Sequence, residues 1–106
     1  MKKYNTKIIK QFIKDSSLPE ETRFLGFVIN LPESDEYLVA VKSEPFMSSH
    51  AWAKNPEMAI VYNNYKKAIL VLKEYNKAAA VICLLFDMGH QLAVVSEADF
   101  QDNNLD

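Results

Sequence analysis

Along the first part of the chain, hydrophobic residues recur with the spacing of one side of an α-helix. Between residues 3 and 14 these apolar positions are Ile8, Ile9, Phe12 and Ile13. The opposite side of the same helical wheel carries four lysines, namely Lys3, Lys7, Lys10 and Lys14. This pattern predicts an amphipathic helix with one face in the core and one in solvent. We expect it to end before Pro19, because proline disfavours helical geometry in the preceding residue.

The next hydrophobic residues alternate with a period of two, which is the pattern of β-strands. Two such runs, residues 23–31 and 37–42, are rich in β-branched and aromatic residues. The five residues between them include Pro32 and three acids, and they suit a loop of hairpin length. We therefore expect a β-hairpin over 23–42.

Residues 43–55 show no clear periodicity, and strong helix-start signals follow them. Asn55 is suited to cap a helix, Pro56 to be its first residue, and Glu57 to lie beside the positive end of the helix dipole. A continuous apolar arc extends from there to about Lys77. The sequence thus predicts a loop over 44–55 and a long helix over 55–77.

The last hydrophobic segments predict a second hairpin. Residues 79–86 are almost wholly apolar, as in a strand covered on both faces, and 87–90 suit a tight turn into a strand over 91–96. The whole pattern is α-β-β-α-β-β, an α+β fold in which two helices cover a four-stranded, mainly antiparallel sheet. Residues 1–98 form a single domain in this prediction, and 99–106 form an acidic, partly disordered tail.

One face of such a sheet needs a further cover, because the strand over 79–86 is apolar on both sides. Either the first helix packs opposite the long helix, or a second copy of the chain buries Phe24, Val28 and part of this strand. The second solution predicts a homodimer, which is the one we expect.

Charge and composition exclude several classes of function. A net charge of −2 gives no general attraction to nucleic acid, and Arg23 is the single arginine, whereas arginine is the usual reader of guanine and phosphate. No apolar run approaches the roughly 20 residues of a membrane span, and no signal-peptide core forms. The lone Cys83 suits a reducing compartment. We expect a cytoplasmic protein that does not bind membranes and whose main partner is not nucleic acid.

The same composition leaves no framework for a cofactor or a metal. With only Gly26 and Gly89, the chain cannot build the glycine-rich loops that bind nucleotides. It has no cysteine pair and no His-Glu-x-x-His helix. Cys83, set among apolar neighbours, is expected to be a buried and inert thiol. We therefore predict no cofactor, no metal and no catalytic residue.

The segment 44–55 is the strongest candidate for a binding site. It brings Phe46, Met47, His50 and Trp52, the only tryptophan, into a loop longer than most. Such side chains offer large, adaptable apolar area beside polar groups. The alternative is structural: Phe46 and Trp52 would fold back to cover the sheet edge or the start of the long helix.

The two histidines allow further alternatives. His50 follows two serines that could supply a nucleophile, but the chain lacks the glycine pattern of a nucleophile elbow. His90 lies in the predicted turn, close to Asp87. If the fold joined His50, Trp52 and His90, they would form a small-molecule pocket or a modest active site. With Asp87, the two histidines would also be ligands of a type that suits zinc.

The leading hypothesis is a non-enzymatic homodimer that binds an unidentified protein or small-molecule partner. The candidate binding residues are Phe46, Met47, His50, Trp52 and His90. A further alternative is weak binding of an anionic partner, including nucleic acid, through the lysine face of the first helix. The bias toward lysine, asparagine and isoleucine suggests an accessory gene of a bacterial mobile element or phage.

Overall fold

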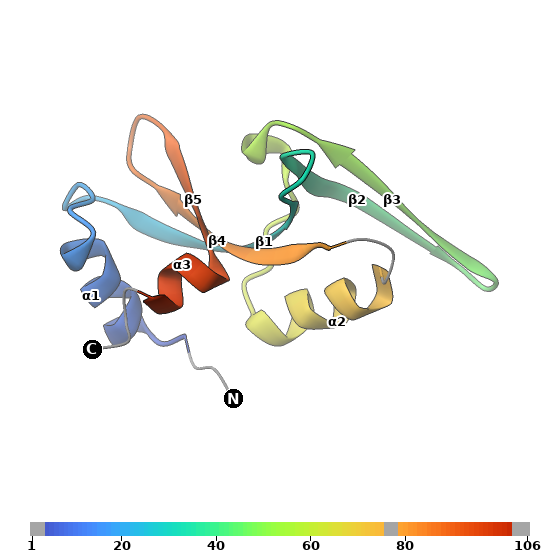
Figure 1. Ribbon diagram of the computed structural model, residues 1–106, viewed down its shortest axis with the longest axis horizontal. Helices are drawn as coiled ribbons and strands as arrows, with labels where there is room; N and C mark the ends of the chain where they lie inside the picture. The colour runs from blue at the N-terminus through green and yellow to red at the C-terminus, as the bar shows by residue number, and fades with distance from the viewer. Residues whose placement is uncertain (1–3, 76–78, 103–106) are drawn as a thin grey trace.

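The computed structural model describes residues 4–75 and 79–102 of the chain. These residues form an α+β unit around a five-stranded antiparallel sheet with strand order β3-β2-β1-β4-β5 (Figure 1). The elements, in chain order, are α1 (Thr6–Asp15), β1 (Arg23–Leu31), β2 (Glu36–Glu44), β3 (Met47–Ala53), the 3₁₀ helix η1 (Pro56–Met58), α2 (Tyr65–Tyr75), β4 (Val81–Asp87), β5 (Leu92–Ser96) and α3 (Glu97–Asp102).

The α+β class and the antiparallel sheet are confirmed, but the predicted count and order of elements are wrong. The sheet has five strands and not four, because β3 occupies most of the segment predicted to be a loop. A third α-helix, α3, follows β5, so the observed order is α-β-β-β-α-β-β-α.

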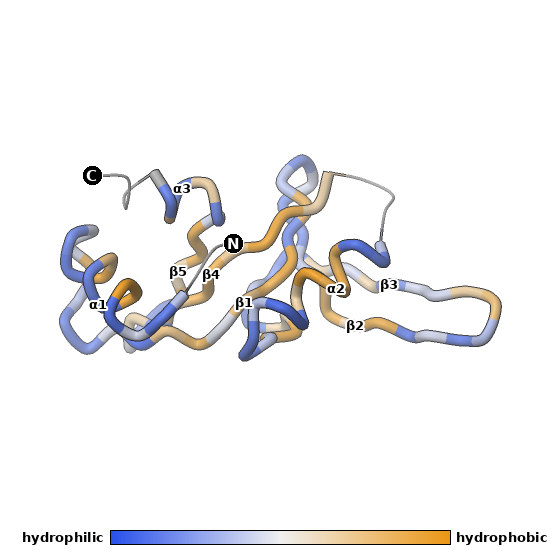
Figure 2. Tube along the Cα trace, turned by 90° about the horizontal axis from the view of Figure 1, so that it is seen from below, coloured by the Kyte–Doolittle hydropathy of each residue, from blue (hydrophilic) through white to orange (hydrophobic). Residues whose placement is uncertain are grey.

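The main core lies between the sheet and the three α-helices, which all cover the same face (Figure 1). Strands β1 and β4 form its floor, with Phe27 opposite Leu84 and Ile29 opposite Ile82. Figure 2 shows these two strands as largely hydrophobic. The amphipathic pattern of α1 is confirmed, since Ile9 and Phe12 are buried.

The second face of the sheet is covered by the chain itself. Val28, Cys83 and Leu85 are at most 3% exposed there, and they pack with Tyr37 against the segment that follows η1, at Ala59, and against β5. The alternative in which α1 covers this face is wrong, because α1 lies with α2 on the other one. Burial of Val28 therefore does not require a second copy, and the homodimer itself stays a prediction.

Phe24 also lies on a different face from the one expected. A register shift between Phe24 and Gly26 interrupts the regular alternation of β1. Because a bulge adds one residue, Phe24 and Phe27 face the same side, with ring centroids 5.3 Å apart. Phe24 thus belongs to the helix-covered core, where its ring centroid is 5.5 Å from that of Phe86.

The long helix predicted over 55–77 is wrong in its middle. The start signals are real, because the Asn55 side chain accepts a hydrogen bond from the Glu57 N–H at 2.9 Å. After η1, however, the chain becomes extended, and Tyr62 exchanges two backbone hydrogen bonds of 2.8 Å with Phe27 of β1. α2 then begins after a second cap, Asn64. Residues 76–77 of the prediction lie outside the described residues.

The C-terminal segment contributes to the core. The α3 helix runs through the predicted domain boundary at residue 98, and its Phe100 is 2% exposed. The ring centroid of Phe100 lies 4.6 Å from that of Phe12 on α1. The predicted tail beyond Asp102, residues 103–106, lies outside the described residues. Across the described ranges, the helices are too short or too polar to cross a membrane.

Candidate functional site

The β2–β3 hairpin projects from the body of the molecule as an arm. Strand β2 pairs with β1 only through Asn30–Tyr37 and Leu31–Glu36, and the rest of β2 pairs with β3 alone. Figure 1 shows the two strands extending away from the helices. The arm makes the molecule elongated: its radius of gyration is 14.2 Å, whereas about 13 Å is expected for a compact chain of this length.

The end of the arm, which we call the tip, consists of the turn residues Pro45 and Phe46 together with Met47. Glu44 and Met47 are cross-strand partners, so the turn between them has two residues. Phe46 is 99% exposed and Met47 is 65% exposed. Just behind the tip, Lys42 and Glu44 form an ion pair at 3.4 Å. Two large apolar side chains are therefore presented to solvent at the most projecting point of the hairpin.

The base of the arm rests on α2 through aromatic contacts. The ring of Tyr75 lies edge-on to His50 and Trp52, with centroid distances of 4.9 and 5.0 Å. The His50 Nε2 atom is buried and has no hydrogen-bond partner among the described residues. Trp52 thus packs on Tyr75, the last residue of α2, and not at the start of that helix, whereas Phe46 does not fold back.

The prediction that 44–55 is a loop is wrong, because residues 47–53 form β3. Its side chains alternate between Ser48, His50 and Trp52 on one face and Met47, Ser49 and Ala51 on the other. This alternation is hard to recognise because small and polar residues occur on both faces. The proline at the first turn position after Glu44 was the available signal for a hairpin.

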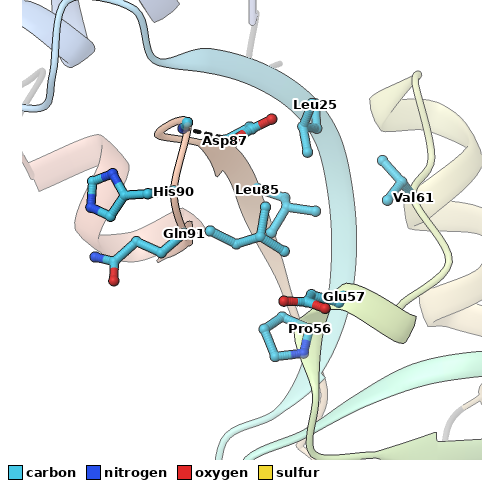
Figure 3. Close-up of a pocket in the computed structure, with 10 residues that line it drawn as sticks. Leu25, Pro56, Glu57, Val61, Leu85, Asp87, His90 and Gln91 are labelled. Carbon is cyan, nitrogen blue, oxygen red and sulfur yellow. Dashed lines mark hydrogen bonds between the residues drawn. The ribbon is translucent and has the colours of Figure 1, made fainter.

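His90 lies at a different place, in the β4–β5 turn beside a shallow cavity of about 380 Å³ (Figure 3). Neither His50 nor Trp52 lines this cavity, so the structure does not bring the three residues of the predicted small-molecule pocket together. Figure 3 shows the His90 ring turned away from Asp87. No three of the His, Cys, Asp and Glu side chains in the described ranges gather closely enough to hold a metal ion.

Asp87 has partners other than His90. Its carboxylate accepts a hydrogen bond from the Gly89 N–H at 2.8 Å and one from the Arg23 guanidinium at 3.1 Å. The Gly89 hydrogen bond and, after it, the Arg23 cation hold the pKa of the Asp87 carboxyl below its usual value. The carboxylate that lies close to His90 in the sequence therefore joins the start of β1 to the end of β4.

Sequence reasoning missed a larger groove between α2 and the helix-covered face of the sheet. The cavity has a volume of about 990 Å³. Aromatic and aliphatic residues form its walls, and Asn63, Lys66 and Lys73 lie at its rim. At one end Tyr4 donates a hydrogen bond of 2.6 Å to Glu97, and burial together with this bond raises the pKa of the Tyr4 hydroxyl. No local sequence pattern predicts the groove, because the residues that line it come from three segments that are distant in the sequence.

The lysine face of α1 is exposed at Lys7, Lys10 and Lys14, while Lys3 lies outside the described residues. Glu20 lines the same shallow cavity as Lys10 and Lys14, so the surface there is of mixed charge. Binding of an anionic partner at this face stays a prediction.

Fold and site together define a small α+β domain with a projecting, apolar-tipped hairpin. Comparisons of the chain with protein-family models, with curated proteins and with solved structures give no match.

Proposed function

We propose that the chain is a non-enzymatic interaction protein whose β2–β3 arm binds a protein partner, and that it acts as a homodimer. The observation that supports this most is Phe46, which is 99% exposed at the end of a hairpin that leaves the body of the molecule. Burying a phenylalanine side chain in a partner stabilises a complex by about 1.5–3 kcal/mol. The tip therefore has the composition of an anchor.

The shape and charge of the arm favour a protein as the partner. Small molecules bind in concave sites, whereas the tip is a convex end with two exposed side chains. Nucleic acids require cationic surfaces, but Lys42 is paired with Glu44 and the arm carries no arginine. An apolar anchor on a short hairpin instead suits a pocket or a strand edge on another protein.

Site-specific photo-crosslinking tests the proposal. The crosslinking amino acid p-benzoylphenylalanine replaces Met47, which is 65% exposed, in cells of the organism that makes the protein. Leu70 is the matched control, because it is 66% exposed but lies on α2 and not on the arm. We expect a covalent adduct to a protein at position 47 and much less at position 70.

A second variant separates binding from folding. Phe46→Ser in the crosslinking chain is expected to remove the adduct while changing the free energy of unfolding by less than about 0.5 kcal/mol, because Phe46 is 99% exposed. An equal yield of adducts at positions 47 and 70, or an adduct that survives Phe46→Ser, would show that the tip is not the binding element.

A further inference from the structure

The outer strand of the arm is an unprotected sheet edge. Among the described strands β3 pairs only with β2, so one row of its N–H and C=O groups has no strand partner. Natural edge strands are usually blunted by charges, prolines or short length. Met47–Ala53 contains no acidic residue, no lysine or arginine and no proline over seven residues. The opposite edge, β5, has only five residues, and α3 begins directly after it.

The turn determines which backbone groups lie on this free edge. Glu44 and Met47 flank the two-residue turn and exchange hydrogen bonds, and hydrogen-bonded and non-bonded pairs alternate along an antiparallel ladder. Lys42–Ser49 is therefore the next bonded pair. The N–H and C=O groups of Ser48, His50 and Trp52 consequently point away from β2, toward the free edge.

We infer that the partner of the arm is a second copy of this chain, which pairs with it antiparallel, β3 to β3, about a two-fold axis at His50. The inference rests on the proposed function, because it names the occupant of the same arm. In this register all three outward-pointing residues pair with outward-pointing residues, Ser48 with Trp52 and His50 with His50. The result is one continuous sheet of ten strands, twice the five of a single copy.

The side chains of β3 are complementary to themselves in this register. Met47 lies opposite Ala53 of the second copy and Ser48 opposite Trp52, so these two large residues each meet a small one, while Ser49 lies opposite Ala51 and His50 opposite its own copy. No two acids and no two lysines face each other within the strand. A foreign peptide is not required to explain the uncharged edge, because the strand supplies its own match.

The same register gives the tip a binding surface. Phe46 of one copy lies beside Lys54 of the second copy, just before Asn55 and the start of η1 at Pro56. The methylene stem of a lysine and the ring of a proline are apolar surfaces against which a phenylalanine can pack. Pairing of β3 would thus cover both the free edge and the exposed apolar tip.

Light scattering and disulfide trapping test this arrangement in the full chain. The natural sequence is expected to have the mass of a dimer over a concentration series from about 1 to 200 µM, a range that detects micromolar affinity. Ser48→Pro removes an outward-pointing N–H without breaking the bonds between β2 and β3, and a monomer is expected. His50→Cys is expected to form a disulfide-linked dimer on mild oxidation, because paired residues have Cα atoms about 5.5 Å apart.

Ser49→Cys is the matched control for trapping, since residue 49 faces residue 51 of the second copy and is expected to stay reduced. Circular dichroism confirms that each variant is folded. A monomeric natural chain, a Ser48→Pro variant that remains dimeric, or equal trapping at positions 49 and 50 would overturn β3 pairing. An adduct at position 47 to a different protein would then still uphold the proposed function, whereas the absence of any adduct would remove both.

Discussion

The Cys83 thiol shows how its surroundings set the reactivity of a single residue. It lies in the middle of β4 and is 3% exposed, packed with Val28 and Leu85. Burial, and to a smaller extent the negative charges of Asp99 and Glu97, raises the pKa of this thiol to about 11. Because the thiolate is the reactive form, the raised pKa and the burial both lower the reactivity of Cys83.

We therefore predict that Cys83 is unreactive in the native protein. At pH 8 a shift of the thiol pKa from 9.0 to about 11 lowers the thiolate fraction about 100-fold. Labelling with Ellman's reagent is expected to be slower by at least that factor than in urea, where the thiol is exposed. Rapid and complete labelling without denaturant would show that β4 opens readily.

The surroundings of a single residue could be predicted from the sequence where its neighbours in the chain determine them. The apolar run around Cys83 predicted its burial, which is confirmed. The side on which Phe24 lies was not predictable from alternation, because the register shift before Gly26 moves it to the face of Phe27. A bulge depends on the partner strand, and a single sequence does not show that strand.

Between elements, Gly26 is the point where β1 meets the extended segment after η1. Its φ angle is +144°, and a Cβ atom there would lie 2.6 Å from the Tyr62 carbonyl oxygen and 2.7 Å from Val61. The contact matters because Phe27 and Tyr62 exchange two hydrogen bonds beside it. A side chain at position 26 would push the segment 61–62 away from the sheet.

Gly26→Ala is accordingly expected to lower the free energy of unfolding by about 2–4 kcal/mol, from backbone strain and from the steric clash. Gly89→Ala is the control, since φ there is +99° but the nearest atom to the added Cβ is 3.9 Å away. In the control, only the backbone strain is expected to lower the free energy of unfolding, by about 1 kcal/mol. Urea unfolding followed by circular dichroism measures both, and equal losses would contradict the importance of the Tyr62 contact.

The same contact explains why some elements were predictable and others were not. α1, the strand over 23–31, a strand within the predicted range 79–86 and the start signals at Asn55 follow from local patterns, and the structure confirms them, with β4 found at Val81–Asp87. The helix predicted over 55–77 had a suitable apolar arc throughout. It is interrupted because Tyr62 pairs with Phe27, which lies 35 residues earlier in the chain, and this pairing outweighs helix propensity.

Over the whole molecule, the sheet consists of two regions, a centre that is packed on both faces and an arm that is not. β1 and β4 pair along most of their length and have core on both faces. The outer half of the arm pairs only within its own hairpin and has no core on either face: Ser43, Glu44, Phe46 and Met47 are all exposed. Local opening should therefore require much less free energy in the arm than in the centre of the sheet.

Hydrogen exchange of the monomeric Ser48→Pro variant tests this difference. Amides of residues 42–44, 46, 47 and 49 are expected to exchange at least about 100-fold faster than those of Ile82, Leu84 and Phe86, because the latter open only when the core does. If the arm were as strongly protected as β4 in this variant, its outer half would have to be packed against another part of the chain.

The candidate site was predictable in composition but not in form. Phe46 and Met47 were recognised as candidates from their residue types, and their exposure makes them the tip of the arm. His90 was grouped with His50 because both are histidines, yet one lies in the β4–β5 turn and the other rests on Tyr75. Which distant residues meet is decided by the sheet order, and composition contains no information about it.

The arm is joined to the body by two strand pairs, Asn30–Tyr37 and Leu31–Glu36, and by the contacts of His50 and Trp52 with Tyr75. A substitution in the outer half of the arm touches none of the side chains that form the two cores. Evolution can therefore alter residues 42–48 freely without loss of folding, and recognition can diverge between descendants of this gene while the body stays the same. For the same reason, an engineer could replace residues 42–48 by a foreign hairpin and keep the scaffold intact.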